Sequence, residues 1–109
     1  MIIVKEYRGH IRNWEELCEK LDISTTLTRE ERENEILVKG YAKWGYDIGN
    51  YMHGMFAFAL FDEEKQEVTE TMRYDGSDKV QTEIRTIYFD SDEPFSTTIN
   101  HYDGILNIL

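Results

Sequence analysis

The single cysteine is the residue best able to act as a nucleophile, and its position argues against that use. Cys18 is the one thiol among 109 residues, so no intramolecular disulfide can form and a reducing compartment is expected. A cysteine attacks as its thiolate, which forms most readily at a partly exposed position beside a positive charge. Cys18 instead shares the apolar face of a predicted helix with Leu17 and Leu21. We expect a buried small hydrophobe.

The histidines and the acidic segment near residue 90 lack the spacing of metal ligands. His10, His53 and His101 lie far apart in the sequence, whereas zinc sites draw their ligands from closely spaced pairs. The segment DSDEP, residues 90–94, lacks the loop length and the glycine of an EF-hand calcium site. We therefore expect no metal ion and no other cofactor.

The charge of the chain restricts the partners that it can bind. With 22 acidic and 12 basic residues, the net charge is −10, which makes contact with a phosphate backbone unfavourable. The acidic residues either keep the protein soluble or attract a basic protein. For a basic partner, we expect the contacts to come from a hairpin tip and a later loop, at Asp62, Glu63, Glu64, Glu67, Asp90, Asp92 and Glu93.

Composition predicts a folded domain. The chain is 40% apolar and contains two tryptophans, seven tyrosines and five phenylalanines, which is typical of a globular core. Its length fits a single domain over residues 1–109. The sequence shows no signal pattern and no apolar run near the length of a membrane span, so we expect a cytoplasmic protein.

Local signals predict two amphipathic helices and a short third one. Asn13 can cap a helix over 14–21, and Thr28 with Glu31 forms a capping-box pattern for a second helix, which Gly45 ends. A short helix over 47–52 follows. Strands are expected at 2–7, 55–61, 67–74, 81–90 and 95–99. This order predicts an α+β fold, a single antiparallel sheet of about four or five strands with helices on one face.

The strand over 55–61 is apolar on both faces. Met55, Ala57, Ala59 and Phe61 alternate with Phe56, Phe58 and Leu60. Helices can cover only one of these faces, and we expect the other to be flanked by polar residues, at Thr69, Thr71, Arg73, Glu83 and Arg85. A second copy of the chain, or else a target protein, should cover that face. We expect a homodimer that associates through Met55, Phe56, Phe58 and Phe61.

Three segments together resemble the glutamine amidohydrolase domain of asparagine-synthetase-like class II amidotransferases. The family's NGEIYN is similar to RGHIRN (8–13), its DTEVIL and later WG are similar to parts of ENEILVKGYAKWG (33–45), and its L-x-G-M-F-A-F-A-L-x-D is similar to MHGMFAFALFD (52–62). The family fold is a four-layer sandwich of two facing sheets between helices. The resemblance implies that this chain corresponds to half of it, without the opening part that carries the N-terminal nucleophile.

The resemblance also locates the family's catalytic positions. Its nucleophile is a cysteine at the mature N-terminus, whereas this chain begins with methionine and two isoleucines. Its oxyanion-hole asparagine falls at Arg8, its glycine is kept as Gly9, and its two acids fall at His10 and Glu33. Such a site needs accurately placed donors. We therefore expect no catalytic residue and no glutaminase activity.

The function that follows is a non-catalytic acidic protein-binding module on a degraded glutaminase scaffold. Its size, charge and lack of chemistry fit an inhibitor of a nucleic-acid-binding protein or nuclease, of the anti-CRISPR kind that phages encode. The alternative is a fragment or subunit of an amidotransferase that completes the glutaminase in trans. A remnant without activity is the third reading.

Overall fold

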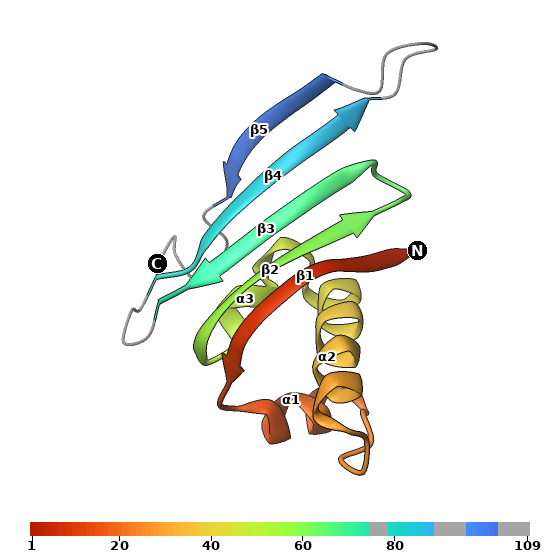
Figure 1. The fold of residues 1–109 in the computed structure, drawn as a ribbon, viewed down its shortest axis with the longest axis vertical. Helices are drawn as coiled ribbons and strands as arrows, with labels where there is room; N and C mark the ends of the chain where they lie inside the picture. Colours follow the sequence, from red (N-terminus) through yellow and green to blue (C-terminus); the bar gives the residue numbers. More distant parts are fainter. Residues whose placement is uncertain (75–78, 89–95, 103–109) are drawn as a thin grey trace.

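The architecture is one sheet with helices on one side. The computed structural model describes residues 1–74, 79–88 and 96–102 (Figure 1). In chain order its elements are β1 (Ile2–Ile11), α1 (Trp14–Leu21), α2 (Arg29–Trp44), the 3-10 turn η1 (Gly45–Asp47), α3 (Ile48–Tyr51), β2 (Gly54–Asp62), β3 (Glu67–Arg73), β4 (Gln81–Tyr88) and β5 (Ser96–Tyr102).

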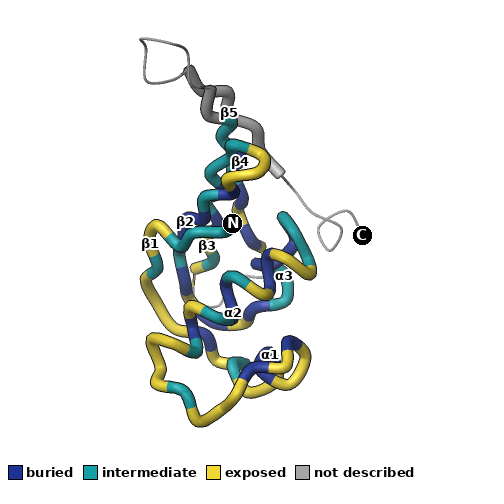
Figure 2. The backbone as a smooth tube through the Cα atoms, turned by 90° about the vertical axis from the view of Figure 1, so that its right-hand side faces the viewer, coloured by how far each residue is buried: buried dark blue, intermediate teal, exposed yellow. Residues whose placement is uncertain are grey.

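The strands form a single antiparallel sheet in the order β1-β2-β3-β4-β5. Every helix in the described part of the chain lies between β1 and β2 in the sequence, yet these two strands are neighbours. Viewed edge-on, α2 and α3 lie on the same side of β1, β2 and β3 (Figure 2). The predicted α+β fold, with one antiparallel sheet and helices on one face, is confirmed.

Both helices begin where the sequence predicts, but only the second has the predicted side-chain cap. The Thr28 hydroxyl accepts a hydrogen bond from the Glu31 backbone N–H at 3.2 Å, and the Glu31 carboxylate accepts one from the Thr28 N–H. The Asn13 side chain makes no cap bond to α1. Its oxygen accepts from the His53 N–H at 2.8 Å, and its nitrogen donates to the Tyr51 carbonyl at 2.9 Å. Asn13 therefore joins the start of α1 to the start of β2.

The core lies between the helices and β2. Phe56, Phe58 and Leu60 are at most 3% exposed. They pack with side chains from all three helices, at Leu17, Cys18, Leu21, Ile36, Leu37, Tyr41 and Ile48. Burying each large side chain contributes about 1.5–3 kcal/mol, so this layer supplies most of the driving force for folding.

The register between β2 and β3 corrects one prediction about the faces of the sheet. The hairpin pairs Asp62 with Glu67, and this register places Thr71 opposite Phe58 and Thr69 opposite Leu60. Directly opposed residues share a face, so the two threonines lie beneath the helices, where they are at most 2% exposed. The expectation that Thr69, Thr71 and Arg73 flank the uncovered face is wrong.

The side of the sheet away from the helices is called the open face from here on. The registers assign to it Ile3, Glu6, Arg8, His10, Met55, Ala57, Ala59, Phe61, Val68, Glu70, Met72, Gln81, Glu83 and Arg85. Glu83 and Arg85 lie there as predicted. Met55 is 50% exposed and Met72 is 37% exposed, so large apolar side chains on this face contact solvent in the isolated chain.

Candidate functional site

The residue at the family's second acid position, Glu33, is fully engaged inside the structure. It lies on α2 against β1 and is 9% exposed. The Tyr7 hydroxyl donates to one carboxylate oxygen at 2.7 Å, and the Arg29 Nε donates to the other at 3.2 Å. The Arg29 Nη2 also donates to the Gly9 carbonyl at 3.2 Å. The bonds to Tyr7 and to the Gly9 carbonyl fasten α2 to the edge strand, and the Arg29–Glu33 bond lies within α2.

The protonation of Tyr7 reinforces this arrangement. Burial, and secondly its hydrogen bond to Glu33, raise the pKa of Tyr7 well above its ordinary value. The hydroxyl therefore keeps its proton and remains a donor to the carboxylate. Tyr7, Glu33 and Arg29 form a hydrogen-bonded cluster between β1 and α2.

The other positions singled out by the family resemblance do not converge on Glu33. Arg8 and His10 project onto the open face, whereas Glu33 lies on the helical side of the sheet. The Arg8 side chain is 82% exposed, and its Nη2 lies 3.4 Å from the Glu6 carboxylate. A substrate on one face cannot contact both sets of groups.

Gly9 has a structural explanation that is independent of chemistry. Its φ is +116°, and a Cβ at this position would lie 2.2 Å from the Met55 carbonyl oxygen. Gly54 on the adjacent strand shows the same feature, with φ +132° and 2.2 Å to the His10 carbonyl oxygen. The two strands approach so closely here that only glycine fits.

Cys18 is placed as a core residue. Its side chain is 1% exposed within α1, in the cluster beneath the sheet. Burial raises the pKa of the thiol, which disfavours the nucleophilic thiolate. The geometry gives this thiol no access to a substrate in solution.

The predicted partner-binding acids separate into four groups. Glu63 and Glu64 are exposed at the tip of the β2–β3 hairpin. Asp62 is 6% exposed and accepts hydrogen bonds from the Tyr41 hydroxyl at 3.0 Å and from the backbone N–H of Glu64 at 3.0 Å. It therefore shapes the turn and does not present its carboxylate to a partner. Glu67 is half-buried and accepts from the Tyr46 hydroxyl. The remaining three, Asp90, Asp92 and Glu93, lie outside the described residues.

The predicted self-association residues fall on opposite faces. Met55 and Phe61 lie on the open face, while Phe56 and Phe58 are 3% exposed beneath the helices. Only the first pair is available to a second molecule. The reason is the strict alternation of side chains along β2.

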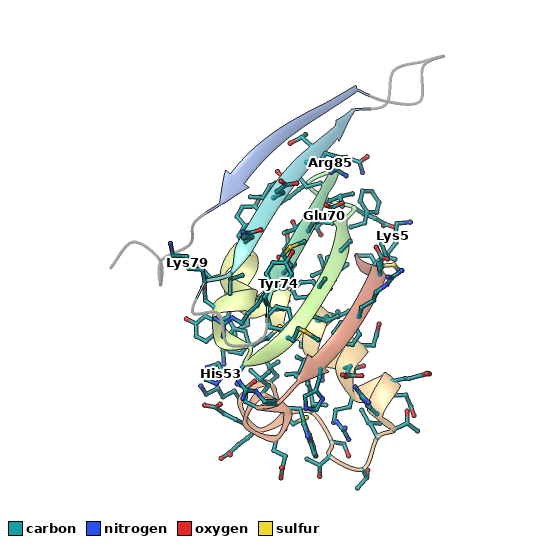
Figure 3. The ribbon with its side chains drawn as sticks, turned by 60° about the vertical axis from the view of Figure 1, so that its left-hand side comes forward. Lys5, His53, Glu70, Tyr74, Lys79 and Arg85 are labelled. Carbon is teal, nitrogen blue, oxygen red and sulfur yellow. The ribbon has the colours of Figure 1, made fainter. Side chains whose placement is uncertain are left out.

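A depression on the open face is the feature that sequence reasoning missed. It has a volume of about 280 Å³ and is lined by Glu6, Arg8, Ala57, Phe58, Ala59, Glu70, Thr71 and Met72. Glu70 of β3, which lines the depression, is labelled in Figure 3 together with Lys5 of β1 and Arg85 of β4. The depression is also lined by Ala57 and Ala59, two small residues between the larger Met55 and Phe61 on the same face of β2. This pattern of small and large residues is the sequence signal that could have predicted the depression.

Among residues 1–74, 79–88 and 96–102, no group of three or more His, Cys, Asp or Glu side chains is placed to hold a metal ion. Within the same ranges, no helix has the length and apolar character needed to cross a membrane.

Comparison with known proteins identifies the family. A family model described as a glutamine amidotransferase domain matches residues 2–75. A protein of Methanocaldococcus jannaschii named asparagine synthetase (glutamine-hydrolyzing) 2 is 36% identical over 63 residues, which are 58% of this chain and 12% of that protein. Asparagine synthetase (glutamine-hydrolyzing) 3 of Bacillus subtilis is 30% identical over 59 residues, which are 54% of this chain and 10% of that protein.

The matched segments thus span about a tenth of the length of these two relatives. The family match is much broader on the side of this chain, because residues 2–75 are well over half of its 109 residues. They include β1, the helices, β2 and β3. The chain belongs to the glutamine amidotransferase domain family.

Proposed function

We propose that this chain is a non-catalytic member of its family that acts by binding another protein. The state of Glu33 carries the proposal. In the family resemblance this position holds the second acid of the site, whereas here each carboxylate oxygen accepts a hydrogen bond, one from Tyr7 on β1 and one from Arg29 on α2. The carboxylate is also buried, so a substrate could reach it only by displacing the packing of α2 on β1.

The remaining catalytic positions support the same proposal. An oxyanion hole depends on donors fixed toward one point, and the guanidinium of Arg8 extends into solvent beside Glu6. The one thiol in the sequence, Cys18, is buried with a raised pKa. A buried free cysteine also agrees with a reducing, cytoplasmic location.

Charge supports a basic protein as the partner. The chain carries −10, and exposed acids lie at the hairpin tip and on the helices, at Glu15, Glu19, Glu30, Glu63 and Glu64. Acidic surfaces raise the association rate with cationic proteins. The proposed target is a nucleic-acid-binding protein or nuclease, whose cationic groove the acidic surface would occupy as an inhibitor.

Glutamine hydrolysis should be absent. We expect ammonia release from the purified chain with glutamine to equal the buffer background, because no exposed thiolate is available to attack the amide. The Cys18→Ala variant is the matched control and should give the same background. A glutamine-dependent signal that disappears in Cys18→Ala would contradict the proposal.

Reversing the hairpin-tip acids should weaken binding of the basic partner. The partner is first captured from a host lysate on the immobilised chain, and its affinity is then measured at low salt. Each exposed charge pair is worth about 0.2–1 kcal/mol. Glu63→Lys with Glu64→Lys also adds repulsion, so we expect an affinity loss of about tenfold, equivalent to about 1.4 kcal/mol.

The variant with Glu15→Lys and Glu19→Lys is the matched control, since it changes the net charge equally on α1. It should weaken binding less than the tip variant if the hairpin makes the contact. Equal affinity of the wild type and both variants at low salt would show that the acidic residues serve solubility alone.

Family membership and the open face favour a second candidate. The chain would supply part of a glutaminase domain to an amidotransferase and complete its active site in trans, with the open face as the docking surface. Mixing the purified chain with candidate amidotransferase subunits in the ammonia assay tests it. Activity that requires both components would favour this candidate over the inhibitor.

A further inference from the structure

We propose that the open face is an interface between two copies of this chain, packed face to face. In this dimer, exposed methionines of one copy enter the depression over Ala57 and Ala59 of the other. The inference goes beyond the proposed function, whose acidic contacts lie at the hairpin tip and on the helices. The two surfaces are separate on the molecule.

The first support is the apolar character of the centre of the face. Met55 is 50% exposed and Met72 is 37% exposed, while Phe61 and Val68 are half-buried. These side chains stand on adjacent strands, since β2 pairs with β3. Large exposed apolar patches that are rimmed by polar residues mark interaction surfaces in soluble proteins.

The second support is shape. The open face carries raised methionines and a depression of about 280 Å³ side by side, because Met72 itself lines the depression. A two-fold symmetric interface pairs one patch with itself, so it needs both the projecting and the hollow part on that patch. This face has both.

The third support is charge. Cationic and anionic side chains balance on the open face: Arg8 and Arg85 project from it, the Lys5 ammonium lies 5.9 Å from the Phe61 ring centroid, and the acids are Glu6, Glu70 and Glu83. The whole chain carries −10. Two copies therefore repel each other least when they approach through this face. A basic partner is attracted more strongly by the acidic residues elsewhere on the surface.

The size of the face is adequate. Five strands spaced by about 4.8 Å, each about seven residues long, make a sheet on the order of 500 Å² in plan. Protruding side chains raise the accessible area toward the roughly 800 Å² per partner of a standard interface. Pairing through the β1 edge is less favourable, because β1 has an irregularity between Val4 and Glu6 and Arg29 occupies the Gly9 carbonyl.

Sedimentation velocity of the full chain over a micromolar concentration range tests the proposal. The wild type should show a monomer–dimer equilibrium. Ala57→Glu places a carboxylate in the depression and should raise the dissociation constant at least tenfold. Ala42→Glu makes the same change at an exposed position of α2 and should leave the constant unchanged.

Salt separates this interface from binding to a basic protein. Added salt shortens the screening length, which is about 10 Å at 0.1 M. Because the two copies repel through their net charge, dimerisation should strengthen or stay constant as salt rises, whereas binding of a basic partner should weaken. A monomeric chain that still binds its basic partner would overturn the dimer and leave the proposed function intact.

Circular dichroism of each variant guards against loss of folding. Should Ala57→Glu unfold, the variant with Met55→Ser and Met72→Ser, both at exposed positions, takes its place and should weaken the dimer to the same extent. A wild type that stays monomeric throughout overturns the proposal in favour of another occupant of the face. So does a dimer that neither folded open-face variant weakens.

Discussion

Replacing Phe58 by alanine is expected to lower the free energy of unfolding by about 3–5 kcal/mol. The Phe58 side chain is 3% exposed, and its ring stacks on Phe56 with 5.7 Å between the ring centroids. Alanine would leave a cavity between β2 and the helices. Small domains are stable by only about 5–15 kcal/mol, so urea unfolding followed by circular dichroism should show a large loss of stability.

Phe61→Ala is the matched control, because Phe61 lies on the same strand but on the open face. Measured at a concentration that favours the monomer, it should cost about 1 kcal/mol. The ratio of the two losses reports which face of β2 the chain covers by itself. Equal and large losses would mean that both faces are buried within one chain, and the open face would not exist.

The helices and the central strand follow from local signals in the sequence. Thr28 and Glu31 sit three residues apart, and both capping hydrogen bonds form. The apolar positions of α1 and α2 recur with helical spacing and become the buried face, as Leu17 and Leu37 show. Such features depend on residues close in the sequence, which is why they were predictable.

The assignment of the sheet faces depends on longer-range geometry. Along β3, Val68 and Met72 alternate with Thr69 and Thr71, a pattern typical of a strand that buries its apolar residues. In the structure the two threonines are buried instead, and Val68 and Met72 lie on the open face. The Asp62 carboxylate accepts hydrogen bonds from backbone N–H groups of the hairpin turn, and the resulting register turns the threonines toward the helices.

Thr71 tolerates its buried position because it is small and its hydroxyl has a hydrogen-bond partner. The Thr82 hydroxyl donates to the Thr71 hydroxyl at 3.4 Å, and both residues are buried. The Thr71 methyl packs so closely against α3 that a Cβ added to Gly49 would lie 2.6 Å from it. Hydrophobicity alone could not have revealed this fit.

The roles of single polar residues also depend on contacts between segments that are distant in the sequence. Asn13 was predicted to cap α1 and Asp62 to contact a partner, yet each holds two distant segments together. Asn13 bonds to residues near β2, and Asp62 bonds to Tyr41 on α2. The sequence alone does not distinguish a short polar side chain that caps a helix from one that contacts a partner or bridges two elements. The role of such a side chain depends on which elements pack around it.

Gly9→Ala should be among the most destabilising substitutions outside the hydrophobic core. Alanine at φ +116° is strained, at a cost of about 1–3 kcal/mol. Its Cβ would also lie 2.2 Å from the Met55 carbonyl oxygen and 2.7 Å from the Phe56 Cα. Both are backbone atoms of the paired strand, so β1 would have to move away from β2. We expect a loss of at least about 3 kcal/mol in the free energy of unfolding.

Gly45→Ala is the matched control, because it introduces backbone strain without a steric clash of the added Cβ. Gly45 also has a positive φ, +60°, but nothing lies within 4 Å of a Cβ at that position. It should therefore cost only the strain, about 1–2 kcal/mol, in the same urea titration. If Gly9→Ala proves no worse than Gly45→Ala, the close approach of β1 and β2 does not require glycine at position 9. The match of Gly9 to the family's oxyanion-hole glycine would then need a chemical explanation, and the non-catalytic assignment would lose one of its structural arguments.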